Sequence, residues 1–409
     1  MKRICGVAGL LALGATCAFG AGYGIYEGSA RANAMGAECT ADPVSPSVLY
    51  ENPAAMTELE GTQVELGLTM VKPKQSVVAN TPAGSVKAHG RSHWWYLPTM
   101  YVTHPLAERL WLGVGGFTRI GLGAEYPKGW AGRYGVQKAE ILSYDVNPSL
   151  ALKVTDSFSL AAGLQVEYFD FELCRAIPTG TAFVDPDAML KITGDNYGLG
   201  YNAGAYWKAT DWISFGLAYE AEIEHHVKGE YSLYTDAATL QEGSAAGDFP
   251  SPGRARLGTS LKPFKPLTID LGLVYTMWEC YDSLDIDFNP ALLGRVPRSS
   301  SKKNWHDAWR YQIGLEYALN EMWALRCGYV MDKTPDPDYL LDYMVPTNDR
   351  HLWTFGLGWK KDDLRVDLGY TMLIIMDRTV KGHIQDGVWD GTFENGNAHM
   401  ASVSVGYRF

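Results

Sequence analysis

The sequence predicts an all-β protein, a transmembrane antiparallel barrel of 14 strands with an N-terminal plug in its lumen. Three observations predict it. Apolar and polar residues alternate in segment after segment, short and long connections alternate between these segments, and aromatic residues gather beside the short connections. Aromatic residues make up 12% of the 409 residues, with 24 Tyr and 13 Trp. Beyond the N-terminus, no stretch approaches the roughly 18 consecutive apolar residues of a transmembrane helix.

Alternation with a period of two indicates strands, because successive side chains of a strand point to opposite faces. In the last segment Val403, Val405, Tyr407 and Phe409 share one face, whereas serine, glycine and arginine occupy the other. The same pattern predicts fourteen strands, at 62–71, 93–103, 110–122, 138–152, 157–170, 193–208, 212–228, 254–263, 266–281, 305–318, 322–332, 350–360, 363–377 and 398–409. An even number fits a closed barrel with both ends on the periplasmic side.

The connections between the predicted strands alternate in length. Six are short, at 104–109, 155–156, 209–211, 263–266, 319–321 and 361–362. Seven are long, near 72–92, 123–137, 171–192, 229–253, 282–304, 333–349 and 378–397. In outer-membrane barrels, short turns face the periplasm and long loops face the outside.

Five tryptophans lie within a few residues of the short connections. This is the level of an interfacial girdle, where the indole ring contacts lipid while its N–H stays in water. They are Trp111, Trp207, Trp212, Trp323 and Trp359. The alternative is a soluble β-protein with tryptophans in its core.

The face opposite the apolar one is polar, small and charged. In a barrel it points into the lumen, because a charge on the lipid face costs about 2–4 kcal/mol at the midplane. Its charged members are Arg254, Arg256, Arg310, Arg326, Arg365, Glu167, Glu220, Glu222, Glu316, Asp270 and Asp367. Fourteen strands enclose more space than side chains fill, so a further segment is expected in the lumen.

The chain divides into three parts. Residues 1–20 resemble a signal peptide: Lys2 and Arg3 precede an apolar run, and Ala18 and Gly20 suit a cleavage site. A lipoprotein signal at Cys17 is disfavoured, because no large aliphatic residue lies three positions before it. Residues 21–60 are rich in glycine and alanine and fit no strand, so we predict a plug, or hatch, inside the barrel of residues 61–409. The alternative is an unpacked periplasmic tail.

Charge and motifs exclude several functions. The formal net charge is −11, and loss of Lys2 and Arg3 with the signal takes it to −13, so nucleic acid is not an expected partner. We predict no catalytic residue and no cofactor, because GxSxG, P-loop and dinucleotide motifs are missing from the sequence.

We also predict no metal site. His225 and His226 lie close to Glu222 and Glu224, but their spacing matches no zinc motif. Four cysteines follow the signal, at positions 39, 174, 280 and 327, without CxxC spacing. They fit neither a metal site nor a disulfide-dense scaffold, and whether Cys39, Cys174, Cys280 and Cys327 include one disulfide stays open.

Several motifs resemble the long-chain fatty acid outer-membrane transporter (FadL-like) family. Near the start are AGYGIYE at 21–27, SAR at 29–31, and YENPAAM at 50–56, which contains the hatch motif Asn52, Pro53 and Ala54. Further along are WAGRY at 130–134, YTMW at 275–278, WHDAWR at 305–310, WALRCGY at 323–329, TPDP at 334–337 and NDR at 348–350. Their order and spacing cover nearly the whole chain after the signal.

The resemblance implies passive uptake of hydrophobic compounds, long-chain fatty acids before others, through a plugged barrel with a lateral exit. A ligand would meet an apolar groove between the third and fourth external loops, then a pocket near the hatch, and would leave at a distortion in the third strand. The implied ligand-binding residues are Ala21, Tyr23, Ile25, Ile177, Phe183, Leu190 and Leu233. Gly113, Gly115, Gly116, Gly121 and Gly123 break the third strand's pattern and predict its kink, which we place at the first three.

A carboxylate headgroup would need a cation, and the candidates are His306, Arg310 and Arg326. For each arginine the alternative is an ion pair with a lumen acid such as Glu316.

These features predict a bacterial outer-membrane protein that acts as a monomer. Its expected partners are hydrophobic small molecules, either fatty acids or aromatic hydrocarbons, together with outer-membrane lipid and lipopolysaccharide. Two alternatives of another class remain, a general diffusion porin and a structural or adhesive barrel. The plug-like segment argues against a porin.

Overall fold

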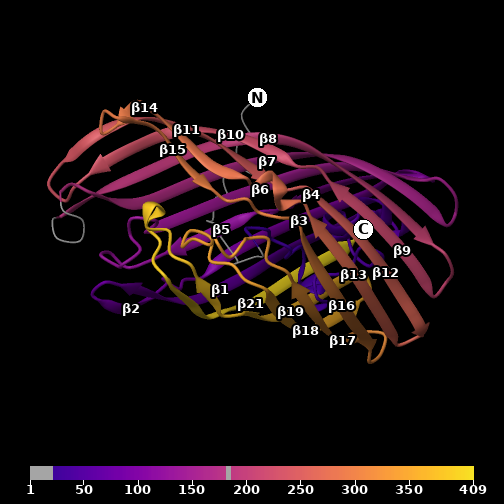
Figure 1. Cartoon of the computed structure of the whole chain (residues 1–409). Helices are drawn as coiled ribbons and strands as arrows, with labels where there is room; N and C mark the ends of the chain where they lie inside the picture. The colour runs from indigo at the N-terminus through magenta and orange to yellow at the C-terminus, as the bar shows by residue number, and fades with distance from the viewer. Residues whose placement is uncertain (1–21, 181–185) are drawn as a thin grey trace.

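The computed structural model describes residues 22–180 and 186–409, which form one closed β-barrel (Figure 1). The wall closes because β1 (Gln63–Thr81) pairs with β3 (Trp95–Ala107) on one side and with β21 (Gly391–Arg408) on the other. The predicted signal peptide, Ala21 and Phe183 lie outside the described residues. No helix in the described part of the chain is long and apolar enough to cross a membrane.

Fourteen strand positions make up the wall, as predicted. Nine are continuous: β1, β3, β6 (Lys138–Lys153), β7 (Phe158–Pro178), β8 (Asp187–Lys208), β17 (Trp323–Asp332), β18 (Arg350–Lys361), β19 (Leu364–Ile375) and β21. Five are interrupted: β4 (Leu110–Phe117) with β5 (Gly121–Glu125), β9 (Ile213–Glu220) with β10 (Ile223–Tyr234), β11 (Thr239–Ser251) with β12 (Arg254–Phe264), β13 (Leu267–Thr276) with β14 (Ser283–Leu292), and β15 (Val296–Lys302) with β16 (Ala308–Ala318). Short β2 (Gly84–His89) and β20 (Arg378–Val380) pair with the ends of β1 and β21.

The end that carries the long connections is more regular than the sequence predicted. Four predicted loops are largely β-hairpins: β1 and β2 pair up to Thr81 and Gly84, β7 and β8 stay paired up to Pro178 and Asp187, and β10–β11 and β14–β15 form two more. The sequence missed these extensions because, beyond the bilayer, neither face of a strand has to be uniformly apolar. In outer-membrane barrels this is the external end.

The two faces of the wall follow the predicted alternation with two exceptions. Leu199 on the outer face is 77% exposed, whereas Arg254 and Arg256 on the inner face are buried. Glu222 was predicted to face the lumen but is exposed, because the gap between β9 and β10 shifts the alternation. Trp111 was predicted in the girdle but is only 8% exposed, because it lies on the inner face of β4 and its Nε1 donates to the carbonyl of Leu59 at 3.2 Å.

The segment from residue 22 to residue 60 is enclosed by the wall. Its helices are α1 (Ala30–Ala34), α2 (Val48–Glu51) and the 3-10 helix η1 (Pro53–Glu58). Helix α1 contacts β1, β17, β18, β19 and β21, whereas η1 contacts β4, β6, β7 and β8. Because these groups of strands lie in different parts of the wall, the segment crosses the lumen.

Local capping and ion pairs position this N-terminal segment. The Ser29 hydroxyl accepts a hydrogen bond from the Ala32 amide, and the Asn52 side chain accepts one from the Ala54 amide, so each begins a helix as an N-cap. Asn52 also donates to the carbonyl of Ala205 in the wall at 2.9 Å. Arg256 of β12 forms an ion pair with Glu51 at 2.8 Å.

Glycines on the inner face let the N-terminal segment approach the wall closely. A Cβ atom at Gly216 of β9 would lie 2.1 Å from the carbonyl oxygen of Thr40, and one at Gly314 of β16 would lie 2.4 Å from that of Met35. These are contacts with backbone atoms, which cannot rotate away.

Gly216→Ala is expected to displace the N-terminal segment while the barrel persists, because the new methyl group collides with Thr40 and not with the wall. Residues 22–60 should be cut faster by added protease in detergent, while unboiled protein keeps the electrophoretic mobility of a folded barrel.

Gly116→Ala in β4 is the matched control, because its Cβ would lie 3.8 Å or more from any described atom outside its chain neighbours. Equal protease resistance of Gly216→Ala and the wild type would contradict the prediction.

Candidate functional site

The third strand of the wall is interrupted between β4 and β5. Four residue steps from Phe117 to Gly121 lie opposite only three steps in β6, from Asp145 to Leu142. The third strand therefore carries one extra residue, which is the definition of a β-bulge.

The N-terminal segment supplies hydrogen bonds at this bulge. The Ile25 amide donates to the carbonyl of Arg119 at 2.8 Å, and the Gly121 amide donates to the carbonyl of Tyr23 at 2.8 Å. Arg254 of β12 also donates to the Arg119 carbonyl, at 2.5 Å. Residues 23–25 thus form backbone hydrogen bonds with the third strand at the bulge, where its pairing with β6 is interrupted.

The interruption lies beyond the first three glycines of the expected kink and ends at the fourth, Gly121. Gly113, Gly115 and Gly116 belong to β4, which pairs regularly with both β3 and β6. Gly113 instead makes room for the N-terminal segment, since a Cβ there would lie 2.5 Å from the side chain of Leu49. The pattern of glycines therefore reflects close packing inside the barrel as well as a distortion of the strand.

Tyr23 lies at the centre of an aromatic cluster, which we define as Tyr23, Phe249, Trp278, Tyr281 and Trp305. All five are buried. The ring centroid of Tyr23 lies 4.7 Å from that of Trp278, 5.5 Å from that of Tyr281 and 5.6 Å from that of Trp305. The Tyr23 hydroxyl donates to the carbonyl of Pro250 at 2.7 Å, so its one polar atom is satisfied. The cluster presents mainly aromatic surface, and Trp278 Nε1 and the Tyr281 hydroxyl are buried in it without a hydrogen-bond partner among the described residues.

Interruptions of the wall collect these rings at one place. Trp278 and Tyr281 lie in the gap between β13 and β14, Trp305 lies in the gap between β15 and β16, and Phe249 lies near the end of β11. In a continuous strand, alternate residues would face lipid. Where the strand breaks, the chain can turn several large side chains inward together.

An apolar pocket connects the aromatic cluster with the external hairpins. It encloses about 300 Å³, part of it open to solvent, and shares Phe249 with the cluster. Phe171, Ile192, Val227 and Ile286 are among its other lining residues. We call it the apolar pocket.

A second cavity, which we call the mouth pocket, adjoins the apolar pocket at the external end. It encloses about 590 Å³, part of it open to solvent, and shares Ile192, Leu284 and Ile286 with the apolar pocket. Arg175 lines it together with three consecutive serines, 299–301, and donates to Ser299 at 3.3 Å. The Arg175 Nε is buried without a hydrogen-bond partner among the described residues.

Several of the predicted ligand-binding residues come together. Tyr23, Leu190 and Leu233 belong to one buried apolar group, and Ile177 packs against it. Ile25 lies in a separate group with residues of β1, β3, β17, β18, β19 and β21.

The predicted headgroup cations are not gathered at this site. Arg310 forms an ion pair with Asp332 at 2.9 Å, and Arg326 with Glu316 at 2.5 Å and Asp367 at 2.7 Å. For both arginines the structure thus shows ion pairs with lumen acids. His306 is exposed.

Sequence reasoning missed Arg175 and did not assign Trp278, Tyr281 and Trp305 to the site. Trp278 and Trp305 lie within the YTMW and WHDAWR motifs, which was a usable signal, and Tyr281 lies three residues after YTMW. Nothing local marks Arg175, because its importance depends on serines more than a hundred residues away. The four cysteines, Cys39, Cys174, Cys280 and Cys327, are free thiols.

The adjacent histidines that suggested a metal site point to opposite faces of β10. His225 is buried and bonds to Glu167 at 2.8 Å, whereas His226 is exposed and bonds to Asp248 at 2.7 Å. They therefore cannot bind one ion together.

Comparison with known proteins shows which family has this architecture. Residues 11–409 match a family model described as outer membrane protein transport protein (OMPP1/FadL/TodX). A 47 kDa outer membrane protein of Pasteurella multocida is 24% identical over 394 residues, covering 89% of this chain and 88% of that protein. The long-chain fatty acid transport protein of Escherichia coli strain K12 is 22% identical over 398 residues, covering 88% and 87%.

Solved structures show the same fold. A FadL homologue of Pseudomonas aeruginosa superimposes with a TM-score of 0.85 at 21% identity, covering 95% of this chain and 100% of that one. The toluene transporter TodX of Pseudomonas putida gives 0.73 at 19% identity, covering 93% and 98%. Because the family model spans nearly the whole chain, this protein belongs to the outer membrane transport proteins of the OMPP1/FadL/TodX family and is located in the bacterial outer membrane.

Proposed function

We propose that this barrel takes up hydrophobic compounds, long-chain fatty acids before others, by passive diffusion. The observation that supports it most is the apolar route from the mouth pocket through the apolar pocket to the aromatic cluster, inside a lumen lined with charges. Burial of each CH₂ group of an acyl chain gains about 0.8 kcal/mol, so such a route can extract the chain from water. Relatives named as long-chain fatty acid and toluene transporters favour substrates of this kind.

Arg175 is the cation that we assign to a fatty-acid headgroup. Its Nε lacks a partner in the described structure, and serines 299–301 line the same cavity. A carboxylate placed there would accept charge-assisted hydrogen bonds, while its acyl chain follows Ile192 and Ile286 into the apolar pocket. Arg310 and Arg326 suit this role less well because lumen acids already bind them.

The N-terminal segment, residues 21–60, is proposed to act as a hatch that blocks small solutes. Its residues from 22 onward are almost all buried against the wall, which supports this role. Release is proposed to be lateral, at the bulge of the third strand, where Tyr23 and Ile25 bond to the interrupted backbone. Movement of residues 23–25 would free that backbone and the aromatic cluster together.

The remaining assignments follow from the same geometry. The barrel closes on itself through β1 and β21, so a monomer is sufficient. Outer-membrane lipid and lipopolysaccharide would surround its exposed apolar face. We assign it no catalytic step and no cofactor.

Oleate and toluene are both expected to change the intrinsic fluorescence of the purified protein, because Trp278 and Trp305 lie in the aromatic cluster. Arg175→Gln should weaken oleate binding about tenfold, which corresponds to a loss of roughly 1.4 kcal/mol of binding free energy. The affinity for toluene should stay unchanged, because toluene has no carboxylate.

Arg298→Gln is the control, since Arg298 is exposed and pairs with Asp287. A flat titration with both ligands would contradict the transport proposal. Normal oleate binding by Arg175→Gln would contradict only the headgroup assignment.

A general diffusion porin is the alternative that conductance can exclude. In planar bilayers the wild type is expected to show no large steady current, because the N-terminal segment fills the lumen. A steady open current of porin size would overturn the proposal of a hatch.

The loop of residues 333–349 covers the external side of the site. Leu341, Tyr343 and Val345 are buried in the same apolar group as Tyr23. Lys303 forms an ion pair with Asp342, and Arg378 donates to the carbonyl of Thr347 at 3.0 Å. These contacts hold the loop over the mouth pocket, which Asp342 also lines.

Alkaline pH is expected to loosen this loop. Burial and the neighbouring charge of Asp342 raise the pKa of Asp336 to about 8, so its carboxyl group is protonated at neutral pH. The stability that this protonation contributes is complete below the ordinary pKa of about 3.9 and is lost as pH rises through about 8. Amide hydrogen exchange in residues 333–349, corrected for intrinsic rates, should accelerate between pH 6 and 9 relative to Asp336→Asn.

The Asn variant keeps the shape of the neutral carboxyl group and cannot lose its proton. If wild type and variant respond to pH identically, Asp336 does not control the loop.

A further inference from the structure

Four tyrosines lie on the outer face of one side of the wall, with Tyr197 and Tyr201 exposed and Tyr168 and Tyr219 half-buried. The rings of Tyr168 and Tyr197 lie 5.1 Å apart, and those of Tyr201 and Tyr219 lie 6.1 Å apart. Tyrosines of this kind gather at the interface between hydrocarbon and headgroups. Beyond them toward the external end, β8 and β10 expose charged residues, and Asp195 is paired with Lys228. This part of the outer wall lies at the level of lipid headgroups.

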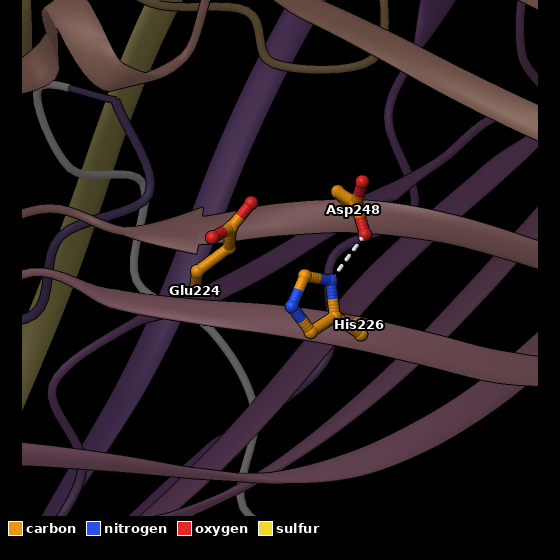
Figure 2. Close-up of side chains that lie close together, drawn as sticks. All are labelled: Glu224, His226 and Asp248. Carbon is orange, nitrogen blue, oxygen red and sulfur yellow. Dashed lines mark hydrogen bonds and ion pairs between the residues drawn. The ribbon is translucent and has the colours of Figure 1, made fainter.

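Glu224, His226 and Asp248 form a compact group on this outer wall (Figure 2). Glu224 and His226 are two residues apart on β10 and so share one face. Asp248 on β11 is directly opposite His226 in the antiparallel register. One potential ligand atom from each residue lies within 4.8 Å of the other two.

The side-chain contacts bring one imidazole and two carboxylates side by side. His226 Nδ1 bonds to Asp248 Oδ1 at 2.7 Å, and the other ring nitrogen lies on the side of Glu224 (Figure 2). Metal binding releases protons from the ligands, so an ion here would replace the proton that His226 shares with Asp248. No hydrogen bond or ion pair to the Glu224 carboxylate occurs within residues 22–180 and 186–409, so it is available as a ligand.

The donor set indicates the class of ion. Mg²⁺ and Ca²⁺ prefer oxygen ligands alone, whereas an imidazole with carboxylates suits Zn²⁺, Co²⁺ and related ions. Ligand atoms around a tetrahedral Zn²⁺ lie about 3.3 Å apart, given bonds of about 2.0 Å. All three side chains are exposed. Small rotamer changes can therefore bring the ligand atoms from within 4.8 Å of one another to about 3.3 Å without moving the paired strands.

We propose that Glu224, His226 and Asp248 form a divalent transition-metal site of the Zn²⁺ class on the outer wall. The paired strands β10 and β11 hold the three residues in place, and water completes the coordination sphere. The ion offsets two carboxylates that would otherwise repel anionic headgroups at this level. The site is independent of the apolar route and of its substrates.

Co²⁺ tests the site directly, because its visible absorption reports coordination in the detergent-solubilised full-length protein without a histidine tag. The wild type should bind one equivalent with micromolar affinity, and Zn²⁺ should displace it, whereas millimolar Mg²⁺ should not. His226→Gln should weaken binding at least tenfold, and Glu224→Gln should weaken it as well.

His399→Gln is the matched control, since His399 is also exposed on a strand but bonds to the hydroxyl of Tyr370 at 2.7 Å. It should bind Co²⁺ like the wild type, and the mobility of unboiled protein shows that each variant is folded. Unchanged Co²⁺ binding by His226→Gln, absence of binding by the wild type, or displacement by Mg²⁺ would each overturn the proposal.

Discussion

Backbone hydrogen bonding at the depth of the lipid is the constraint on which this structure depends. Water is absent there, so each N–H and C=O of the wall needs a partner within the chain. The pairing of β1 with β21 removes the last free edge. The bulge in the third strand would break this rule, and the N-terminal segment resolves it: Tyr23 accepts from Gly121, and Ile25 donates to Arg119. The contacts that hold the N-terminal segment in the lumen are therefore also the contacts that complete the wall.

The lumen combines two environments that serve different purposes. Around the N-terminal segment, charged side chains form ion pairs such as Arg256 with Glu51 and Arg326 with Asp367, which satisfy buried charges. Toward the external end, aromatic and aliphatic side chains line the apolar pocket and the aromatic cluster. Tyr23 lies at the boundary, bonded to the bulge through its backbone and packed in the cluster through its ring. A ligand that displaces this ring would also disturb the backbone hydrogen bonds at the bulge. Ligand binding in the cluster would thereby change the structure of the wall.

Interruptions of the wall have a shared consequence. Five of the fourteen strands break, and their gaps contain Trp278, Tyr281 and Trp305 or adjoin Phe249. At the gap between β9 and β10 the alternation shifts, so that Glu222, Glu224 and His226 face outward while His225 faces inward. The same irregularities thus collect aromatic rings inside the barrel and place acidic residues and a histidine on its outer surface.

The sequence by itself determined the barrel, its fourteen strands and the inner position of residues such as Arg254, because lipid on one face and water on the other impose a period of two. The family resemblance also gave Tyr23, Leu190 and Leu233 as candidate ligand contacts, and the structure buries all three in one apolar group. Only the tertiary structure decided what depends on distant residues: Arg175 beside Ser299, Asp248 opposite His226, and Trp111 turned toward Leu59. The sequence also missed the hairpin extensions and the position of the bulge in the third strand, because the alternation of apolar and polar residues is lost once both faces of a strand contact protein or water. The alternation of residues along a strand depends only on whether each face contacts lipid, water or protein. The composition of a site depends on which distant segments the closed wall brings together.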